Sequence, residues 1–250
     1  MKYAAILATL SGLAAALPNP AAVEQTKAVP RRTGRTKNSG FNRKLTEYPT
    51  YSSNWAGAVQ IGKGFNKVVG TITVPEVSGD ADAAASAWVG IDGDTCQTAI
   101  LQTGVSFYGD GTFDAWYEWI PDYSHSFANF GISAGDQIRM TVDASSKTTG
   151  VAILENLTTG KKVSHTFTST PSTLCETNAE WIVEDFESGG SLVPFANFGT
   201  VTFTDASASG SSGTVTPSGA QIFDFRDSSG QVLTNCGTSG SDLSCSYTGN

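Results

Sequence analysis

Residues 86–121 read SAWVGIDGDTCQTAILQTGVSFYGDGTFDAWYEWIP, and this stretch decides the fold class. It contains three runs, at 86–92, 98–108 and 112–121, that alternate apolar and polar side chains or are rich in aromatic and β-branched residues. Turn signals separate the runs, including GDG at 109–111. A period of two is typical of half-buried strands, so the stretch predicts three consecutive β-strands joined by short connections.

The same pattern continues on both sides of this stretch. Further strands are expected at 67–77, 137–144, 150–156, 161–168, 178–187, 198–204 and 220–226. Between them, residues 80–87 predict a loop rather than a helical turn, and no long helical period appears. Many short strands with regularly spaced turns favour an all-β fold in one domain, an antiparallel β-sandwich of the concanavalin-like jelly-roll type.

Alternation also predicts which side chains share a face. Four of the predicted strands have one largely apolar face, which indicates the core side. The opposite faces gather Trp88, Asp92, Gln102, Asp114, Trp116, Glu118, Glu180 and Glu184. Tryptophan among acids favours an open, concave face that binds a ligand, with an ordinary solvated face as the alternative.

Composition excludes several classes of protein. The chain has 250 residues, of which 39% are hydrophobic and only 15% charged, and it holds 27 glycines. This composition fits strands and turns better than a helical bundle. The net charge of −8 argues against nucleic-acid binding, because phosphate contacts need a basic surface. Zinc motifs are absent, and neither a metal nor a cofactor is expected.

The N-terminal part of the sequence differs in charge from the rest. The first 50 residues carry 8 basic and 2 acidic side chains, whereas the remaining 200 carry 7 and 21. Lys2, an apolar run and the small residues Ala14–Ala16 predict a secretory signal peptide over 1–16. The protein is therefore expected to be secreted and extracellular, with no membrane contact once the signal is removed.

The basic segment 17–50 is interpreted as a pro-segment, with Arg43–Lys44 as a candidate processing site. At neutral pH it can lie across the acidic domain 51–250 and inhibit it, and it should release when carboxylates protonate. A plain linker is the alternative. The strongly acidic domain is expected to work as a monomer in an acidic environment, and to be more stable there than at neutral pH.

Four cysteines behind a signal peptide predict two disulfides. Three pairings are possible. The turn-forming GTSGSDLS favours Cys236–Cys245 as a hairpin closure, which leaves Cys96–Cys175. Asn156, in NLT, is the candidate glycosylation site.

The residue types narrow the chemistry without deciding it. His125 and His165 lie outside any recognisable nucleophile motif, and Asp92-Gly93-Asp94 predicts a turn rather than a calcium loop. Catalysis by carboxylate side chains is the chemistry that these exclusions leave. Glu118 and Glu184 could be the acid–base pair of a glycoside hydrolase, or one glutamate could act with a neutral amide on an acyl carbon. A non-catalytic, lectin-like module is a further alternative.

Four motifs resemble the fungal glutamic peptidases, or eqolisins. They are WVGIDGDTCQTAILQTG at 88–104, YGDGTFDAWYEW at 108–119, ENLTTGKKVSHTF at 155–167 and CETNAEWIVEDFE at 175–187. SNWAGAV at 53–59 is similar to the family's mature start, so the resemblance extends from there to the C-terminus. It implies a sandwich of two curved antiparallel sheets, and a secreted, pepstatin-insensitive acid endopeptidase that cleaves polypeptides.

The resemblance places a catalytic dyad on Gln102, in LQTG, and Glu184, in IVEDFE. It implies that Glu184 takes a proton from the attacking water and that the Gln102 amide donates to the oxyanion. Ile120 stands where the family pattern has a tyrosine, and both disulfides fit the family's bridging pattern. With the alternating face, the expected substrate-binding set is Trp55, Trp88, Asp92, Asp114, Trp116 and Glu118.

Overall fold

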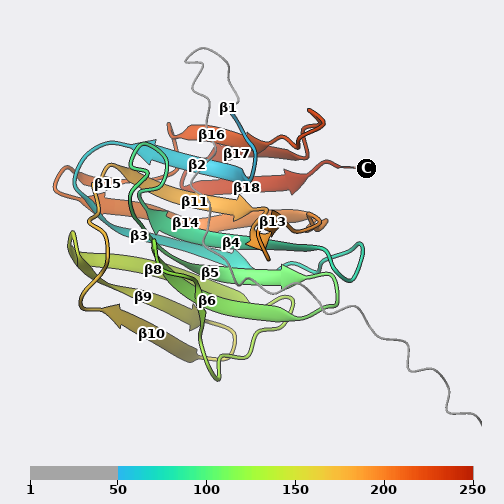
Figure 1. The fold of residues 1–250 in the computed structure, drawn as a ribbon, viewed down its shortest axis with the longest axis horizontal. Helices are drawn as coiled ribbons and strands as arrows, with labels where there is room; N and C mark the ends of the chain where they lie inside the picture. Colours follow the sequence, from blue (N-terminus) through green and yellow to red (C-terminus); the bar gives the residue numbers. More distant parts are fainter. Residues whose placement is uncertain (1–49, 250) are drawn as a thin grey trace, which may run out of the picture.

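The computed structural model describes residues 50–249, which form a sandwich of two β-sheets (Figure 1). The all-β prediction is confirmed for this range. The described part of the chain has no helix long and apolar enough to cross a membrane. The predictions for the signal peptide over 1–16, and for all of the pro-segment except Thr50, fall outside the described residues.

The first sheet carries all of the strands predicted from residues 86–121. Its order is β1-β16-β2-β11-β4-β5-β6-β7, and all its pairings are antiparallel except that β1 pairs with β16 in parallel. The strands are β1 (Thr50–Ser52), β2 (Trp55–Ile61), β4 (Ala84–Ile91), β5 (Ile100–Tyr108), β6 (Phe113–Ile120), β7 (His125–Ser126), β11 (Asn178–Glu184) and β16 (Gln221–Phe225).

The second sheet packs against one face of the first (Figure 1). Its order is β10-β9-β8-β3-β14-β18-β17, and β15 pairs with β14. The strands are β3 (Phe65–Thr73), β8 (Gln137–Ser146), β9 (Thr149–Asn156), β10 (Lys161–Phe167), β14 (Thr200–Gly210), β15 (Gly213–Val215), β17 (Thr234–Ser239) and β18 (Asp242–Tyr247). The strands β12 (Glu187–Ser188) and β13 (Ser191–Leu192) form a separate small hairpin.

The main core lies between the two sheets and uses the apolar faces that alternation predicts. From β4 it takes Ala87, Val89 and Ile91, and β5 adds Leu101 and Val105. One tryptophan joins the sheets directly, since the Trp181 indole nitrogen on β11 donates to the Val69 carbonyl on β3 at 2.8 Å. Because the core takes every second residue of these strands, the alternate residues are left on the other face of the first sheet.

The observed strands differ from the predicted ones mainly at their ends. Residues 84–87 belong to β4, so only the first half of the predicted loop at 80–87 is a loop. The predicted strand at 178–187 ends at Glu184, and Phe186 packs on Tyr108 beyond the end of the strand. Both disulfide pairings are confirmed: Cys236 lies opposite Cys245 in the β17–β18 hairpin, and Cys96 is bonded to Cys175.

Candidate active site

The order of the strands brings Gln102 and Glu184 onto one face of the first sheet. β11 lies between β2 and β4, and Glu184 is opposite Trp55 on one side and Ser86 on the other. β5 lies between β4 and β6, and Gln102 is opposite Gly90 and Glu118. Strand β4 therefore separates the two strands that carry the predicted dyad, and both side chains project away from the main core.

Two glycines on this face make room for the large side chain between them. A Cβ atom added at Gly90 would lie 2.8 Å from Cζ3 of the Trp88 ring, and one added at Gly104 would lie 2.5 Å from the Trp88 Cβ. Both distances are too short for a real side chain. The indole of Trp88 thus lies close to the sheet surface beside Gly90, where a larger residue would displace it.

The carboxylate of Glu184 has a fixed hydrogen-bond donor. The Trp88 indole nitrogen donates to Glu184 Oε2 at 2.9 Å, and both side chains are fully buried. The Trp88 ring in turn packs edge-on against Trp55, with ring centroids 5.0 Å apart. An indole N–H can only donate, so this contact holds one carboxylate oxygen in place without competing for its proton.

The amide of Gln102 is held by a second acid. Its Nε2 donates to Glu118 Oε2 at 2.7 Å, from the adjacent strand. An amide nitrogen carries two N–H groups, so this bond leaves a second N–H to donate elsewhere. Among the described residues, Gln102 Oε1 has no hydrogen-bond partner although it is buried. The arrangement orients the amide and keeps donor and acceptor capacity for a further group.

The predicted open face is not exposed in the 250-residue chain. Gln102, Glu118 and Glu184 all have 0% exposed surface in the full chain. They share the face with a second apolar cluster, which accounts for part of this burial. The cluster consists of Trp55, Val59, Trp88, Ile100, Trp116, Ile120, Ile182 and Phe223. It includes the expected Trp55, Trp88 and Trp116, and Ile120 in place of the family's tyrosine.

Two of the other expected cleft residues have their own partners. Asp114 is half-buried and accepts a hydrogen bond from the Ser126 hydroxyl at 2.7 Å. Asp92 is fully buried, and its two carboxylate oxygens accept hydrogen bonds from the backbone of residues 175–178. This corrects the expectation that Asp92 contacts substrate, because its acceptor atoms face the loop before β11.

The glycosylation candidate is also corrected by its surroundings. Asn156 is 1% exposed, and its Nδ2 donates to Asp136 Oδ2 at 2.8 Å and to the Gly131 carbonyl at 3.3 Å. Its Oδ1 accepts from the backbone N–H groups of Thr158 and Thr159. A sugar on Nδ2 would break buried hydrogen bonds, so Asn156 is a structural residue in the folded chain.

Both histidines lie on the other face of the first sheet from Gln102. The rings of His125 and His165 stack on Tyr117, with centroids at 5.6 Å and 4.0 Å. Tyr117 follows Trp116 and precedes Glu118 on β6, so its side chain projects from the opposite face. Partial burial and the neighbouring His125 lower the pKa of His165. Neither ring takes part in the candidate active site.

Three buried carboxyl groups have raised pKa values. Burial, with the nearby Asp92 and Asp94, raises the pKa of Glu180 well above its ordinary value. Burial, with the adjacent Glu184, raises the pKa of Asp185 to about 8. Burial also raises the pKa of Asp224, against hydrogen bonds from Thr234 and Cys236 that lower it. Each of these carboxyls costs less to bury when it holds a proton.

These pKa values predict that the domain is most stable in acid. Asp185 has an ordinary pKa of 3.8 and a folded value of about 8, so between these values the folded state keeps a proton that the unfolded chain has lost. The free energy of unfolding therefore falls as the pH rises through this window, and the full contribution is present only below the unfolded value. Melting temperatures measured across the window should decrease toward neutral pH.

The variant Asp185→Asn tests the source of this dependence. It removes the titrating group, so the melting temperature should fall less steeply with pH than in the unmodified protein. At about pH 8 the variant should be more stable by on the order of a few kcal/mol. The exposed Asp80→Asn is the matched control and should keep the original slope. Equal slopes for Asp185→Asn and the unmodified protein would contradict the assignment.

Sequence reasoning gave no role to two buried polar residues on the dyad face. Glu180 is a fully buried carboxyl with no hydrogen-bond partner on either oxygen among residues 50–249, and Asn178 begins β11 on the same face. Alternation from Glu184 through Ile182 already placed Glu180 on the shared face, and one further step would have reached Asn178. No local signal could show the burial of either residue, because it depends on the loop at 92–96.

The chain is similar to known proteins in sequence and in structure. Residues 53–247 match the Peptidase A4 family. Aspergillopepsin-2 from Aspergillus niger is 53% identical over 221 residues, covering 79% of this chain and 78% of that protein. Scytalidopepsin B from Scytalidium lignicola is 48% identical over 260 residues, covering 99% of this chain and all of the relative.

Solved structures agree with these sequence matches. Scytalido-glutamic peptidase with a transition state analog inhibitor superposes with a TM-score of 0.76 at 51% identity, covering 78% of this chain and 98% of that structure. Aspergilloglutamic peptidase from Aspergillus niger superposes with a TM-score of 0.64 at 56% identity, covering 66% of this chain and 99% of that structure.

Proposed function

The chain belongs to the Peptidase A4 family and is a glutamic endopeptidase, and from this premise we propose that Glu184 and Gln102 are its catalytic dyad. The proposed reaction is hydrolysis of peptide bonds in protein substrates at acid pH, insensitive to pepstatin. One observation carries the assignment. An acid and an amide project from one face of the first sheet, each held by its own hydrogen-bond partner.

Glu184 is assigned the proton transfers. As a carboxylate it accepts a proton from water while that water attacks the scissile carbonyl carbon, and the carboxyl then returns the proton to the leaving nitrogen. The indole N–H of Trp88 supports this role, because it fixes the carboxylate within a fully buried cluster of large side chains. A rigid base needs no reorganisation when the charge moves.

Gln102 is assigned to the oxyanion. One N–H of its amide is engaged by Glu118, so the second can donate to the negative charge that develops on the carbonyl oxygen. An amide does not ionise, which keeps this donor available at any pH. A histidine would be protonated below about pH 6.5 and could not serve as the base in acid. Glu118 is then an orienting residue for the amide.

The large side chains around the proposed dyad favour the binding of an extended polypeptide substrate. Trp55, Trp88 and Trp116 belong to the apolar cluster on the dyad face, and aromatic side chains provide much contact area at low entropic cost. We assign substrate contacts to these three residues and to Asp114 at the end of the same face. The buried Asp92 is assigned a different role below.

The N-terminal residues are assigned to the secretion of the protein and to the control of its activity. The sequence 1–16 has the features of a secretory signal, and the basic segment 17–50 precedes a strongly acidic domain. We assign these segments to secretion and to inhibition of the domain until the pH falls. Both assignments rest on the sequence.

Peptide release in acid tests the proposed function. The full chain is incubated with a denatured protein at roughly pH 3, below the reference glutamate pKa, with pepstatin present. Acid-soluble peptides should appear, and N-terminal sequencing of the enzyme should show the loss of residues 17–50. Absence of cleavage after this loss would overturn the proposal, and cleavage of a polysaccharide instead would favour the glycoside hydrolase alternative.

A further inference from the structure

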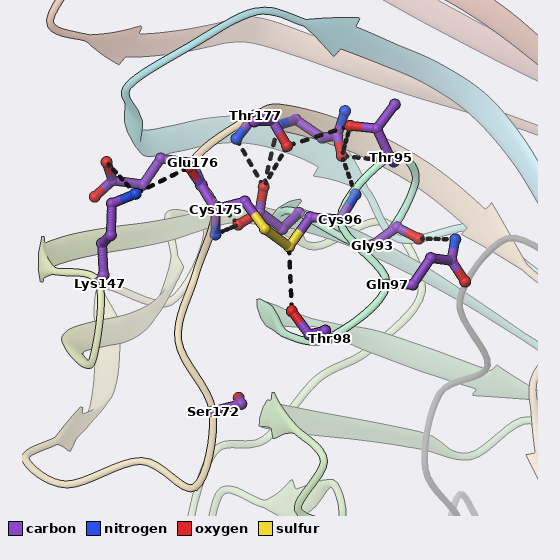
Figure 2. The surroundings of a disulfide bond; sticks show 12 residues. Gly93, Thr95, Cys96, Gln97, Thr98, Lys147, Ser172, Cys175, Glu176 and Thr177 are labelled. Atoms are coloured by element: carbon purple, nitrogen blue, oxygen red, sulfur yellow. Dashed lines mark hydrogen bonds and ion pairs between the residues drawn. A yellow bond between two sulfur atoms is a disulfide. The ribbon is translucent and has the colours of Figure 1, made fainter.

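Two loops lead into the strands that carry the proposed dyad. One runs from Asp92 to β5 and precedes Gln102, and the other ends at Glu176–Thr177 before β11 and Glu184. The Cys96–Cys175 disulfide joins these loops across 79 residues of sequence. Figure 2 shows the disulfide with Thr95, Glu176 and Thr177 gathered around it. Any change in how these loops meet is therefore transmitted to both strands.

The Asp92 carboxylate binds the backbone of the second loop. Its Oδ2 accepts from the N–H groups of Cys175 and Glu176 at 2.7 Å and 2.8 Å. Its Oδ1 accepts from the N–H groups of Thr177 and Asn178 at 2.8 Å and 3.2 Å, and from the Thr177 hydroxyl at 3.2 Å. Four successive backbone donors thus converge on one fully buried carboxylate.

The side chain of Asn178, which directly follows the second loop, binds the backbone of the first loop. Its Oδ1 accepts from the backbone N–H of Thr95 at 2.9 Å, the Thr95 hydroxyl at 2.9 Å and the backbone N–H of Cys96 at 3.3 Å. The Asp92 N–H also donates to the Asn178 carbonyl at 3.2 Å. Each loop therefore has its backbone donors satisfied by a side chain from the other. We call these two residues and their contacts the Asp92–Asn178 clasp.

The backbone conformation at the clasp is unusual. Asp92 has φ of 69° and Glu176 has φ of 63°, values that residues with a side chain seldom adopt. Each such residue costs on the order of 1–3 kcal/mol, so the surrounding contacts must hold it. The five hydrogen bonds to the Asp92 carboxylate are contacts of this kind. The clasp is thus a defined local structure rather than a loose loop contact.

The clasp lies where the strand pairing of the dyad begins. Asp92 directly follows β4, and Asn178 is the first residue of β11, the strand paired with β4. From this point the pairing runs to Glu184 opposite Ser86, while β5 pairs with β4 to place Gln102 opposite Gly90. A shift of one residue in a strand would turn its side chains to the other face.

We propose that Asp92 and Asn178 are positioning residues, whose clasp sets the register of β11 and β5 on β4 and thereby the relative placement of Glu184 and Gln102. The proposal rests on the dyad assigned above. It gives Asp92 a role in kcat, whereas a substrate contact would give it a role in KM. A merely structural role would lower the melting temperature and leave kcat per folded molecule unchanged.

Kinetics of Asp92→Asn distinguish these roles. An amide in place of the carboxylate directs an N–H toward backbone donors, so the clasp should loosen. Because a misplacement of 1 Å can cost about 10²-fold in rate, kcat should fall by roughly 10- to 100-fold with KM nearly unchanged. The matched control is Asp224→Asn, which removes another buried carboxylate that accepts from the Cys236 N–H and the Thr234 hydroxyl. Asp224→Asn should lose stability with kcat unchanged.

Asn178→Asp provides a second variant that keeps the acceptor oxygen. Its added carboxyl would lie in the clasp with Asp92, whose Oδ1 accepts the backbone N–H of Asn178, and Asp92 and Asp94 in turn act on the buried Glu180. In acid the variant should keep a kcat close to that of the unmodified protein. As the pH rises, its kcat should decline at a lower pH than that of the unmodified protein, because the added group ionises. Loss of activity at all pH values, or an unshifted pH profile, would contradict the proposed role of Asn178.

A spectroscopic readout separates this proposal from the proposed function. The Trp88 indole N–H donates to Glu184, so its proton resonance and its exchange with solvent report the position of that carboxylate without any substrate. Asp92→Asn should shift this resonance and speed its exchange, and Asp224→Asn should not. An unchanged resonance would overturn the clasp proposal. Lack of peptidase activity in the unmodified protein would overturn the proposed function and leave this readout valid.

Discussion

Replacement of Glu184 by glutamine is expected to abolish peptide release. The variant keeps the size of the side chain and an oxygen that can accept from the Trp88 indole, so the fold and the Trp88 contact should survive. What it loses is a group that can take and return a proton. Because one residue serves as base and then as acid, kcat should fall by roughly 10⁴-fold, the upper end of general acid–base effects.

The measurement is kcat and KM on a peptide substrate in acid, with the melting temperature recorded for each variant. KM should change little, since the amide fills the same space. Glu187→Gln, three residues further along in β12, is the matched control and should retain activity. Substantial turnover by Glu184→Gln would show that another group is the base, and Glu118 would then be the first to examine.

Replacement of Gln102 by alanine is expected to have the next largest effect. The change removes the proposed oxyanion donor from a fully buried position, and loss of one such donor typically costs about 10²- to 10³-fold in kcat. KM should again change little, because the donor acts on charge that develops only in the transition state. The glycoside hydrolase alternative predicts instead that Gln102→Ala keeps much of its activity.

A second readout checks that the effect comes from the amide. Alanine also deprives Glu118 of the N–H that Gln102 donates at 2.7 Å, so part of the loss could reflect a disturbed carboxylate. Gln102→Glu keeps the side-chain length and, when protonated, an O–H donor, so it should recover activity only toward low pH. The control Gln60→Ala removes an amide bonded to the Thr216 and Ser218 carbonyls and should leave kcat unchanged. Equal activity of Gln102→Ala and Gln60→Ala would reject the oxyanion assignment.

The expected acid stability of the domain comes from particular buried groups and not from net charge alone. Net charge predicts it through repulsion among ionised acids. In the structure, Glu180, Asp185 and Asp224 are buried carboxyls whose pKa values are raised chiefly by desolvation. Such groups destabilise the folded state when they ionise, even without a charged neighbour. The direction of the prediction is the same, but its cause lies at named residues that can be substituted.

Sequence alone was sufficient for the properties that depend on neighbours along the chain. Alternation in 86–92, 98–105 and 112–120 correctly separated the core side chains from those of the dyad face, because successive residues of any strand point to opposite sides. The Cys236–Cys245 pair was likewise predictable, since a turn between two short strands brings the cysteines together. The family motifs then supplied the proposed dyad positions, Gln102 and Glu184.

Tertiary structure decided what depends on contacts between distant segments. No local sequence pattern predicts that β11 lies between β2 and β4. This strand order places Glu184 near Trp88, which is 96 residues away in sequence. The burial of the dyad face, the Asp92–Asn178 clasp and the buried Asn156 have the same origin. A side-chain direction is a property of one strand, whereas burial and hydrogen-bond partners are fixed only when separate strands and loops pack together.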